Sequence, residues 1–176
     1  YTLSLHDALP IFPQHLESLL SKLHEIGVDI KVDVDRLIIK GNTGNLKATD
    51  IKTLPYPGFA TDIQQPLTAL LTQAHGQSIV TETIYTERFK HCQELAKMGA
   101  NINVMIPSSF INGPTPLSGA EVSATDLRCG ACLVIAGLIA EGTTTIRNIY
   151  HIERGYEHID EKLSALGAKI WRETIE

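Results

Sequence analysis

The chain has 176 residues, of which 43% are hydrophobic, so it can bury one sizeable core and its length argues for a single domain. Its 15 basic and 20 acidic residues give a net charge of -5, which argues against nucleic acid or a membrane surface as a partner. Three cysteines without framework spacing favour a reducing compartment, and the longest apolar run, 131–140, is shorter than the roughly 20 residues of a membrane span. We therefore expect a soluble cytoplasmic protein.

The first residues, 1–11, differ from the rest of the chain. They lack an initiator Met, the basic start of a signal peptide and any similarity to the repeat described below. The string YTLSLHDALPI resembles translated sequencing-adapter read-through, so we interpret it as a non-native leader. On this interpretation 12–176 is the C-terminal part of a longer protein, comprising the end of one repeat and two full repeats.

The first predicted element after the leader is a helix. Apolar residues recur at helical spacing from Leu16 to Ile26, and Gly27 follows where a left-handed cap is expected. The run 32–39 then favours a β-hairpin. Gly99 and Gly167 end later helical stretches in the same way.

One pattern occurs twice in the remaining sequence. In the first copy, Thr61-Asp62 opens an apolar stretch that ends at Gly76, and a β-rich run leads through Glu87-Arg88 to Gly99. The second copy has Thr125-Asp126, Gly142, Glu153-Arg154 and Gly167. A repeat of this length is a supersecondary unit that needs neighbours to close a core. Alternating helices and strands predict an α/β fold with the units packed side by side.

Both Thr-Asp pairs stand at predicted helix starts. Gln64 follows Thr61 at the spacing of a capping box, and Asp126 precedes the helix predicted over 127–140. Helix N-termini attract anions, and Arg128 in the first turn would strengthen such a site. On spacing alone, however, Asp62 and Asp126 more commonly act as simple N-caps.

Three of the six arginines, Arg88, Arg128 and Arg154, fall within the repeated motifs. Guanidinium groups bind phosphate and carboxylate bidentately, so the three together favour an anion site. Surface ion pairing with the adjacent Glu87 and Glu153 is the alternative.

Other motifs predict no chemistry. Cys129-x-x-Cys132 has redox spacing, but it lies in a small-residue apolar helix and we interpret it as two buried thiols. The seven histidines show no clustered ligand spacing, and His158 is expected on a solvent-facing helix surface. There is no Gly-rich nucleotide loop and no nucleophile elbow, so we predict neither a metal site nor a cofactor.

Five segments in this order and spacing resemble the C-terminal portion of the UDP-N-acetylglucosamine 1-carboxyvinyltransferases. These are enolpyruvyl transferases of bacterial peptidoglycan synthesis. The segments are PGFATDIQQPLTALL, SIVTETIYTERFKH, LSGAEVSATDLR, IAEGTTTIRNIYHIERGYEHI and EKLSALGAKI. The resemblance implies an inside-out α/β barrel built from β-α-β-α-β-β units, incomplete here, with an active site facing a second domain.

The resemblance also implies a reaction. The enolpyruvyl group of phosphoenolpyruvate is transferred to the 3-hydroxyl of UDP-N-acetylglucosamine with release of phosphate, the first committed step of peptidoglycan synthesis, which supports cell shape and division. It implies no cofactor and no metal. The family's cysteine-bearing loop and further phosphoenolpyruvate contacts belong to a portion absent from this chain, including the N-terminal domain, so we expect the chain alone to be inactive.

Individual roles follow from the same resemblance. Asp62 matches the family's sugar-binding Asp and candidate general base, and Ile84 matches a position whose backbone contacts the nucleotide sugar. Arg154 matches an arginine that binds phosphoenolpyruvate. Arg88, Asp126 and Arg128 match other residues of the cleft.

Two alternatives remain from the sequence. The first is the related enzyme that acts on shikimate 3-phosphate, which would need different contacts around Asp62 and Ile84. The second is a non-catalytic α/β repeat protein in which the aspartates are caps and the arginines are surface partners.

Overall fold

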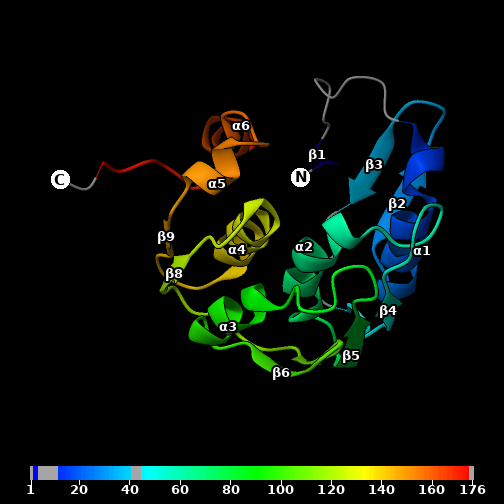
Figure 1. The fold of residues 1–176 in the computed structure, drawn as a ribbon. Helices are drawn as coiled ribbons and strands as arrows, with labels where there is room; N and C mark the ends of the chain where they lie inside the picture. The colour runs from blue at the N-terminus through cyan, green and yellow to red at the C-terminus, as the bar shows by residue number, and fades with distance from the viewer. Residues whose placement is uncertain (1, 4–11, 41–44, 175–176) are drawn as a thin grey trace.

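The structure is a computed structural model that describes residues 2–3, 12–40 and 45–174 (Figure 1). Most of the predicted leader lies outside the described residues. Thr2–Leu3 forms the short strand β1, which pairs antiparallel with β3. No helix in the described part of the chain has the length and apolar character needed to cross a bilayer.

Helices and strands are interspersed along the whole described chain, as expected of an α/β fold. In chain order they are β1 (Thr2–Leu3), η1 (Pro13–Leu16), α1 (Glu17–Ile26), β2 (Asp29–Val32), β3 (Leu37–Lys40), β4 (Ile51–Lys52), α2 (Thr61–Leu71), β5 (Gly76–Thr81), α3 (Lys90–Lys97), β6 (Asn101–Met105), β7 (Ser108–Gly113), β8 (Glu121–Ser123), α4 (Leu127–Ile139), β9 (Thr145–Arg147), α5 (Tyr150–Glu153) and α6 (Ile159–Ala165).

The predicted glycine caps are confirmed. Gly27, Gly99 and Gly167 have φ values of 98°, 95° and 96°, which is the left-handed region that glycine adopts most readily. Gly76 and Gly142, the other matched glycines, also have positive φ values of 112° and 89°. The sequence repeat is therefore also a repeat of backbone conformation.

One unit of the repeat is complete. It runs from β4 to β7 and forms a four-stranded sheet in the order β4-β5-β7-β6. The strands β4 and β5 are parallel and are joined through α2, whereas β7 pairs antiparallel with both β5 and β6. This order matches the β-α-β-α-β-β unit expected from the sequence.

The neighbouring units are partial in the described residues. Before the complete unit, α1 leads into the β2–β3 hairpin, whose strands begin slightly earlier than the predicted run. After it, β8, α4 and β9 repeat the parallel crossover, followed by α5 and α6. Residues 167–174 form no strand, so the second full repeat expected from the sequence lacks its closing strand pair within the described part of the chain.

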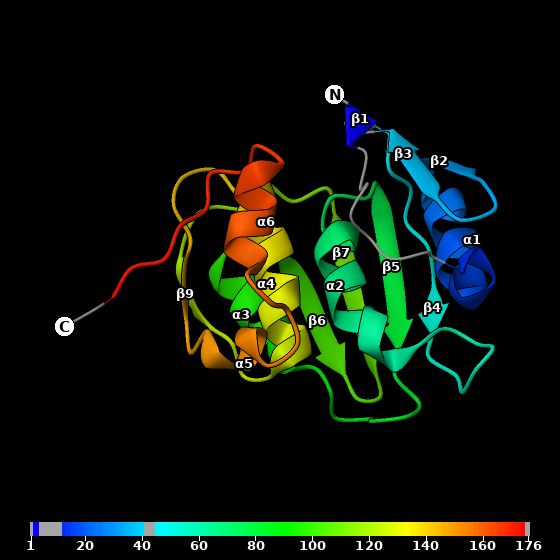
Figure 2. The same ribbon diagram turned by 90° about the horizontal axis from the view of Figure 1, so that it is seen from above.

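The helices α2 and α4 form the centre of the molecule. They lie side by side in Figures 1 and 2, with the sheets toward the outside, as an inside-out arrangement requires. Ala69 of α2 and Cys129, Cys132 and Leu133 of α4 share one buried cluster. Because both helices start at the same end, this packing brings their first turns together.

Gly119 permits close contact between the chain just before β8 and the chain just before β9. A Cβ atom at this position would lie 2.3 Å from the carbonyl oxygen of Thr143, which is backbone and cannot rotate away. We expect Gly119→Ala to lower the free energy of unfolding by about 1–3 kcal/mol, the usual cost of overpacking. Chemical unfolding followed by circular dichroism would measure the loss.

The matched control is Gly137→Ala in α4. There the added Cβ would meet Thr144 no closer than 3.5 Å, an ordinary contact, and alanine favours the helix. This variant should be as stable as the parent or more stable. Equal stability of the two variants would contradict the proposed backbone clash.

Candidate active site

The candidate site lies where the first turns of α2 and α4 meet. Asp62 is the second residue of α2, and its carboxylate accepts a hydrogen bond from Nε of Arg128 in α4. Nη1 of Arg88 lies 3.4 Å from the same oxygen of Asp62. The three residues come from both copies of the sequence repeat, and the parallel packing of the two helices joins them.

The two aspartates have different structural roles. Asp126 is the N-cap of α4 and accepts hydrogen bonds from the backbone N–H groups of Arg128 at 2.8 Å and Cys129 at 3.0 Å. Asp62 is not a cap, because Ala60 occupies the N-cap position of α2 without a side-chain hydrogen bond. Asp126 is therefore a helix N-cap, whereas the interpretation of Asp62 as an N-cap is wrong.

The predicted capping box at Thr61 and Gln64 is also wrong. The side chain of Gln64 is fully buried, and neither of its polar atoms has a partner in the described residues. Thr61 instead donates its hydroxyl proton to Glu82 at 2.8 Å. A tertiary contact has thus replaced the local cap.

Glu82 organises this region and was missed by the sequence analysis. It is fully buried, and its carboxylate accepts hydrogen bonds from the hydroxyls of Thr53 and Thr61 and from the backbone N–H groups of Ile84 and Tyr85, all at 2.7–3.0 Å. Burial alone would raise the pKa of Glu82, but these hydrogen bonds outweigh it and hold the pKa below its usual value. The ionised carboxylate fixes the loop after β5 to the start of α2.

Arg88 is held by contacts on two sides. Its Nη1 donates to the Thr61 hydroxyl at 2.9 Å, and its guanidinium lies 4.0 Å from the centre of the Tyr85 ring. The latter distance is within the range of a cation–π interaction. Arg88 therefore connects the loop anchored by Glu82 to the carboxylate of Asp62.

A pocket of about 540 Å³ opens beside this cluster. Three of its lining residues, Ile84, Arg88 and Asp126, were predicted from the sequence to bind substrate. Gln65, which was not, also lines it. The Gln65 side chain is 1% exposed, and its Oε1 has no partner in the described residues, so it leaves an acceptor close to the pocket.

Arg154 lies apart from the cluster. It follows α5 as its C-cap residue and is exposed, and no hydrogen bond or ion pair within residues 12–40 and 45–174 joins it to Asp62, Arg88 or Arg128. The next residue, Gly155, packs closely against Leu127 at the start of α4. The chain next to Arg154 is thus packed on the start of α4, the helix that carries Arg128.

The alternative of surface pairing with adjacent glutamates does not describe these arginines. Glu153 pairs with Arg172, and Arg88 pairs with Asp62. Among the described residues, no ion pair joins Arg88 to Glu87 or Arg154 to Glu153.

The ion pairs shift the ionisation of Asp62. The hydrogen bond from Arg128 lowers the pKa of the Asp62 carboxyl, partial burial opposes this, and the charges of Arg128 and Arg88 lower the pKa further. Asp62 is therefore ionised at neutral pH, but it is a weak proton acceptor while both arginines remain on it.

The cysteines and histidines occupy structural positions. Cys92, Cys129 and Cys132 are free and buried, as expected for the last two, and burial raises the pKa of the Cys92 thiol to about 12. Thiols of this kind are poor nucleophiles. His158 is exposed, as predicted, whereas His91 is fully buried. In the described ranges, no group of three or more His, Cys, Asp or Glu residues could hold a metal ion.

This fold has solved relatives. The enolpyruvyl transferase NikO from Streptomyces tendae matches with a TM-score of 0.85 and 31% identity, over 92% of this chain and 37% of that one. An EPSP synthase from Acinetobacter baumannii matches with a TM-score of 0.64 and 19% identity, over 89% of this chain and 37% of that one, and supports the fold alone. The class defined by the fold is that of the enolpyruvyl transferases.

The sequence comparison places the chain in a family. The family model described as EPSP synthase (3-phosphoshikimate 1-carboxyvinyltransferase) matches residues 9–163, so the chain belongs to this family. Among curated proteins, UDP-N-acetylglucosamine 1-carboxyvinyltransferase 2 of Bacillus subtilis is 57% identical over 165 residues, and the protein of that name from Geobacillus kaustophilus is 56% identical. Each alignment covers 94% of this chain and 38% of the relative, so the chain spans little more than a third of their length.

Proposed function

We propose that this chain forms part of an enolpyruvyl transferase acting on UDP-N-acetylglucosamine and phosphoenolpyruvate. The proposal rests on one observation above all: two arginines from different repeat units meet on a single aspartate beside a pocket. The similarity to proteins named UDP-N-acetylglucosamine 1-carboxyvinyltransferase supports the choice of substrates.

The chemistry of phosphoenolpyruvate fits the arginines. This substrate carries a phosphate and a carboxylate, and guanidinium groups bind both bidentately. Arg88, Arg128 and Arg154 would hold these anions, and Asp126 would keep the first turn of α4 in place as its cap. Fixed positive charge also stabilises the negative charge that develops during transfer.

The role of Asp62 follows from its ion pairs. When substrate anions draw the guanidinium groups of Arg128 and Arg88 away, the causes that lower the pKa of Asp62 weaken and the carboxylate becomes a stronger base. Asp62 would then take the proton of the sugar 3-hydroxyl as its oxygen adds to carbon 2 of phosphoenolpyruvate, while carbon 3 takes a proton from an acid in the rest of the polypeptide. The tetrahedral adduct would subsequently lose phosphate from carbon 2 and a proton from carbon 3, which restores the double bond of the enolpyruvyl ether.

The nucleotide sugar would lie in the pocket beside this cluster. The backbone of Ile84, positioned through Glu82, would contact the sugar, and the free acceptor of Gln65 provides a further polar group at the same place. In the cell, the reaction would contribute to bacterial peptidoglycan synthesis in the cytoplasm, and the rest of the polypeptide would supply a second domain over the pocket.

The test is a chimera in which residues 12–174 are joined to the remaining polypeptide of the Bacillus subtilis relative. We expect phosphate release from phosphoenolpyruvate that depends on UDP-N-acetylglucosamine and does not occur with shikimate 3-phosphate. The 176-residue chain alone should release none. Dependence on shikimate 3-phosphate would favour the related enzyme, and an inactive but folded chimera would favour the non-catalytic alternative.

A further inference from the structure

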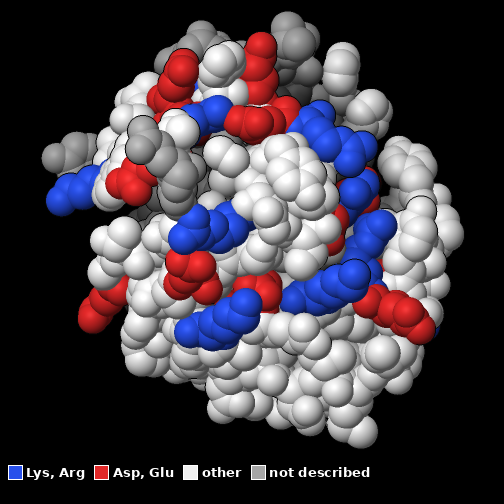
Figure 3. Space-filling model, turned by 60° about the vertical axis from the view of Figure 1, so that its left-hand side comes forward, with Lys and Arg blue, Asp and Glu red and all other residues white. Residues whose placement is uncertain are grey.

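Glu82 differs from the other carboxylates of the chain in how its charge is balanced. The face shown in Figure 3 has Lys and Arg interleaved with Asp and Glu, and Glu94, the other buried carboxylate of the described residues, pairs with Lys97 at 2.8 Å. Glu82 is fully buried and has no basic partner in the described residues. Because burying an uncompensated carboxylate is costly, its neutral hydrogen-bond donors must stabilise the charge.

The two oxygens of Glu82 have separate partners. Oε1 accepts from the Thr53 hydroxyl at 2.7 Å and from the backbone N–H groups of Ile84 and Tyr85 at 2.8 and 3.0 Å. Oε2 accepts from the Thr61 hydroxyl at 2.8 Å. One oxygen thus holds the loop after β5, and the other holds the first residue of α2.

The bond to Oε2 fixes the direction of the Thr61 hydroxyl. An ionised carboxylate can only accept hydrogen bonds, so the Thr61 proton points to Glu82 and the lone pairs of the Thr61 oxygen remain available. Nη1 of Arg88 donates to that oxygen at 2.9 Å and lies 3.4 Å from the carboxylate of Asp62. Glu82 therefore orients Arg88 through a single intervening hydroxyl group.

The bonds to Oε1 leave one backbone acceptor of the loop free. The N–H groups of Ile84 and Tyr85 both donate to Glu82, whereas the Ile84 carbonyl accepts no hydrogen bond from the described residues. Ile84 is partly exposed and lines the pocket beside the site. Its carbonyl is thus the backbone group that can bind an N–H or O–H of a sugar.

The second copy of the repeat forms without this carboxylate. The offset of 66 between the repeated Glu-Arg pairs, 87–88 and 153–154, makes Asn148 the counterpart of Glu82, and each directly follows its strand, β9 or β5. The Asn148 amide donates to the Ser123 hydroxyl at 2.8 Å. The parallel crossover β8-α4-β9 is therefore built with a neutral side chain at this position.

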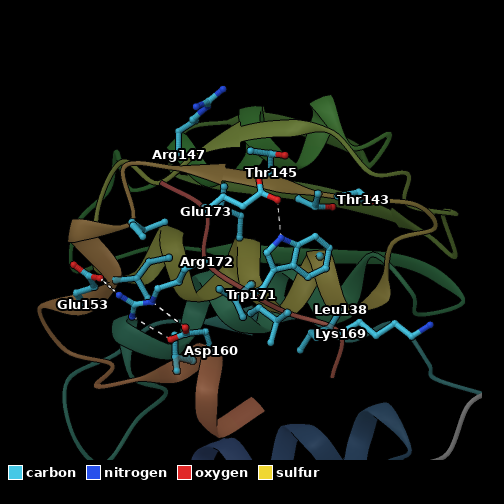
Figure 4. A pocket seen from close by; sticks show the side chains of 18 of the residues that line it. Leu138, Thr143, Thr145, Arg147, Glu153, Asp160, Lys169, Trp171, Arg172 and Glu173 are labelled. Atoms are coloured by element: carbon cyan, nitrogen blue, oxygen red, sulfur yellow. Dashed lines mark hydrogen bonds and ion pairs between the residues drawn. The ribbon is translucent and has the colours of Figure 1, made fainter. Parts of the chain in front are cut away.

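The charged groups of the second copy have other partners. Glu153 pairs with Arg172, which also pairs with Asp160 at 2.9 Å (Figure 4). Glu153 and Arg172 are exposed, and exposed ion pairs contribute little to stability. Since the same crossover forms without a buried carboxylate, the fold alone does not account for Glu82.

We propose that Glu82 is a positioning residue that serves the two substrate sites through separate oxygens. Its Oε1 holds the loop that binds the nucleotide sugar through Ile84, and its Oε2 orients Arg88 for phosphoenolpyruvate through Thr61. This inference rests on the function proposed above. Because each arm uses a different oxygen, each can be tested by itself.

The first experiment removes the arm that leads to Arg88. Thr61→Val deletes the hydroxyl between Oε2 and Arg88 and leaves the bonds to Oε1 in place. In the chimera with the Bacillus subtilis polypeptide, the KM for phosphoenolpyruvate should rise roughly 10-fold or more, while that for UDP-N-acetylglucosamine stays within about 3-fold. Thr61→Ser keeps the hydroxyl and should restore the parent values. A general weakening of the fold would not separate the two constants.

The second experiment changes both arms. The amide of Glu82→Gln offers a weaker, neutral acceptor to the loop and an N–H donor to Thr61, which reverses that hydrogen bond. Both KM values should rise, and adding Thr61→Val should raise the KM for phosphoenolpyruvate no further, because the two changes act through one bond. The matched control is Glu25→Gln, a carboxylate outside the site that also accepts from a threonine, Thr49, and it should keep both parent values.

Hydrogen exchange in the 176-residue chain tests the loop without catalysis. The amides of Ile84 and Tyr85 should exchange roughly 10-fold faster in Glu82→Gln and at the parent rate in Thr61→Val. An inactive parent chimera would count against the proposed function, and the exchange rates would still decide whether Glu82 holds the loop. Unchanged exchange at Ile84 in Glu82→Gln, or additive effects of the two substitutions on the KM for phosphoenolpyruvate, would overturn the proposal.

Discussion

Asp62→Asn and Arg154→Ala are each expected to lower turnover of the chimeric enzyme by at least roughly 100-fold, the scale of general-base and charge-stabilising contributions. Asparagine has nearly the same shape as Asp62, but it cannot take a proton and cannot form ion pairs with Arg88 and Arg128. Removing Arg154 deletes one of the three guanidinium groups proposed to hold phosphoenolpyruvate. Steady-state phosphate release at saturating substrates would measure both losses.

The controls separate chemistry from folding. Asp29→Asn and Arg147→Ala alter an exposed aspartate and an arginine whose ion pairs, with Lys40 and Glu121, lie outside the candidate site. Both should retain turnover within a few-fold of the parent. Because Asp62 caps no helix and Arg154 is exposed, the two site variants should also unfold near the parent temperature. Full turnover in either site variant would support the non-catalytic interpretation.

The chain is expected to lose roughly 3 kcal/mol of its free energy of unfolding between about pH 6.5 and pH 4 through His91 alone. Burial lowers the pKa of His91 from 6.5 to about 4, and the charge of Asp126 only partly opposes this. The unfolded chain therefore binds a proton at higher pH than the folded chain does. The contribution is fully present above pH 6.5 and is lost as the pH falls toward 4.

Urea unfolding at several pH values would measure this slope. His91→Leu removes the titrating group, so its stability should vary less over the same interval, even if the variant is less stable at neutral pH. His158→Gln changes an exposed histidine and should retain the full slope. A parent chain whose stability is constant from pH 6.5 to pH 4 would contradict the assignment.

Local features of the fold could be predicted because local sequence determines them. Gly27, Gly99 and Gly167 end helices through a backbone conformation that strongly favours glycine, and the apolar spacing before each of them defines the helix. The helix predicted over 127–140 is observed as Leu127–Ile139. The repeat then predicted how such elements would be ordered.

The contacts of the site were less accessible to sequence reasoning. Glu82 follows a strand without a distinctive spacing, and its partners Thr53 and Thr61 lie 29 and 21 residues away in the chain. The hydrogen bond from Thr61 to Glu82 also explains why the predicted capping box does not form. The Thr61 hydroxyl is bonded to a buried carboxylate and not to the backbone of its own helix. A hydrogen bond between residues distant in the chain thus formed in place of the local cap that the spacing predicted. A single sequence does not indicate which distant residues will be in contact.

The different roles of Asp62 and Asp126 also affect how the two sequence copies can diverge. Asp126 holds two backbone N–H groups at the start of α4, so a substitution there changes the helix together with anything the helix carries. Asp62 has no such capping role, because Ala60 occupies the N-cap position of α2. The first copy therefore offers a carboxylate whose properties can be changed by mutation, or by selection for another substrate, with little consequence for the architecture that presents it.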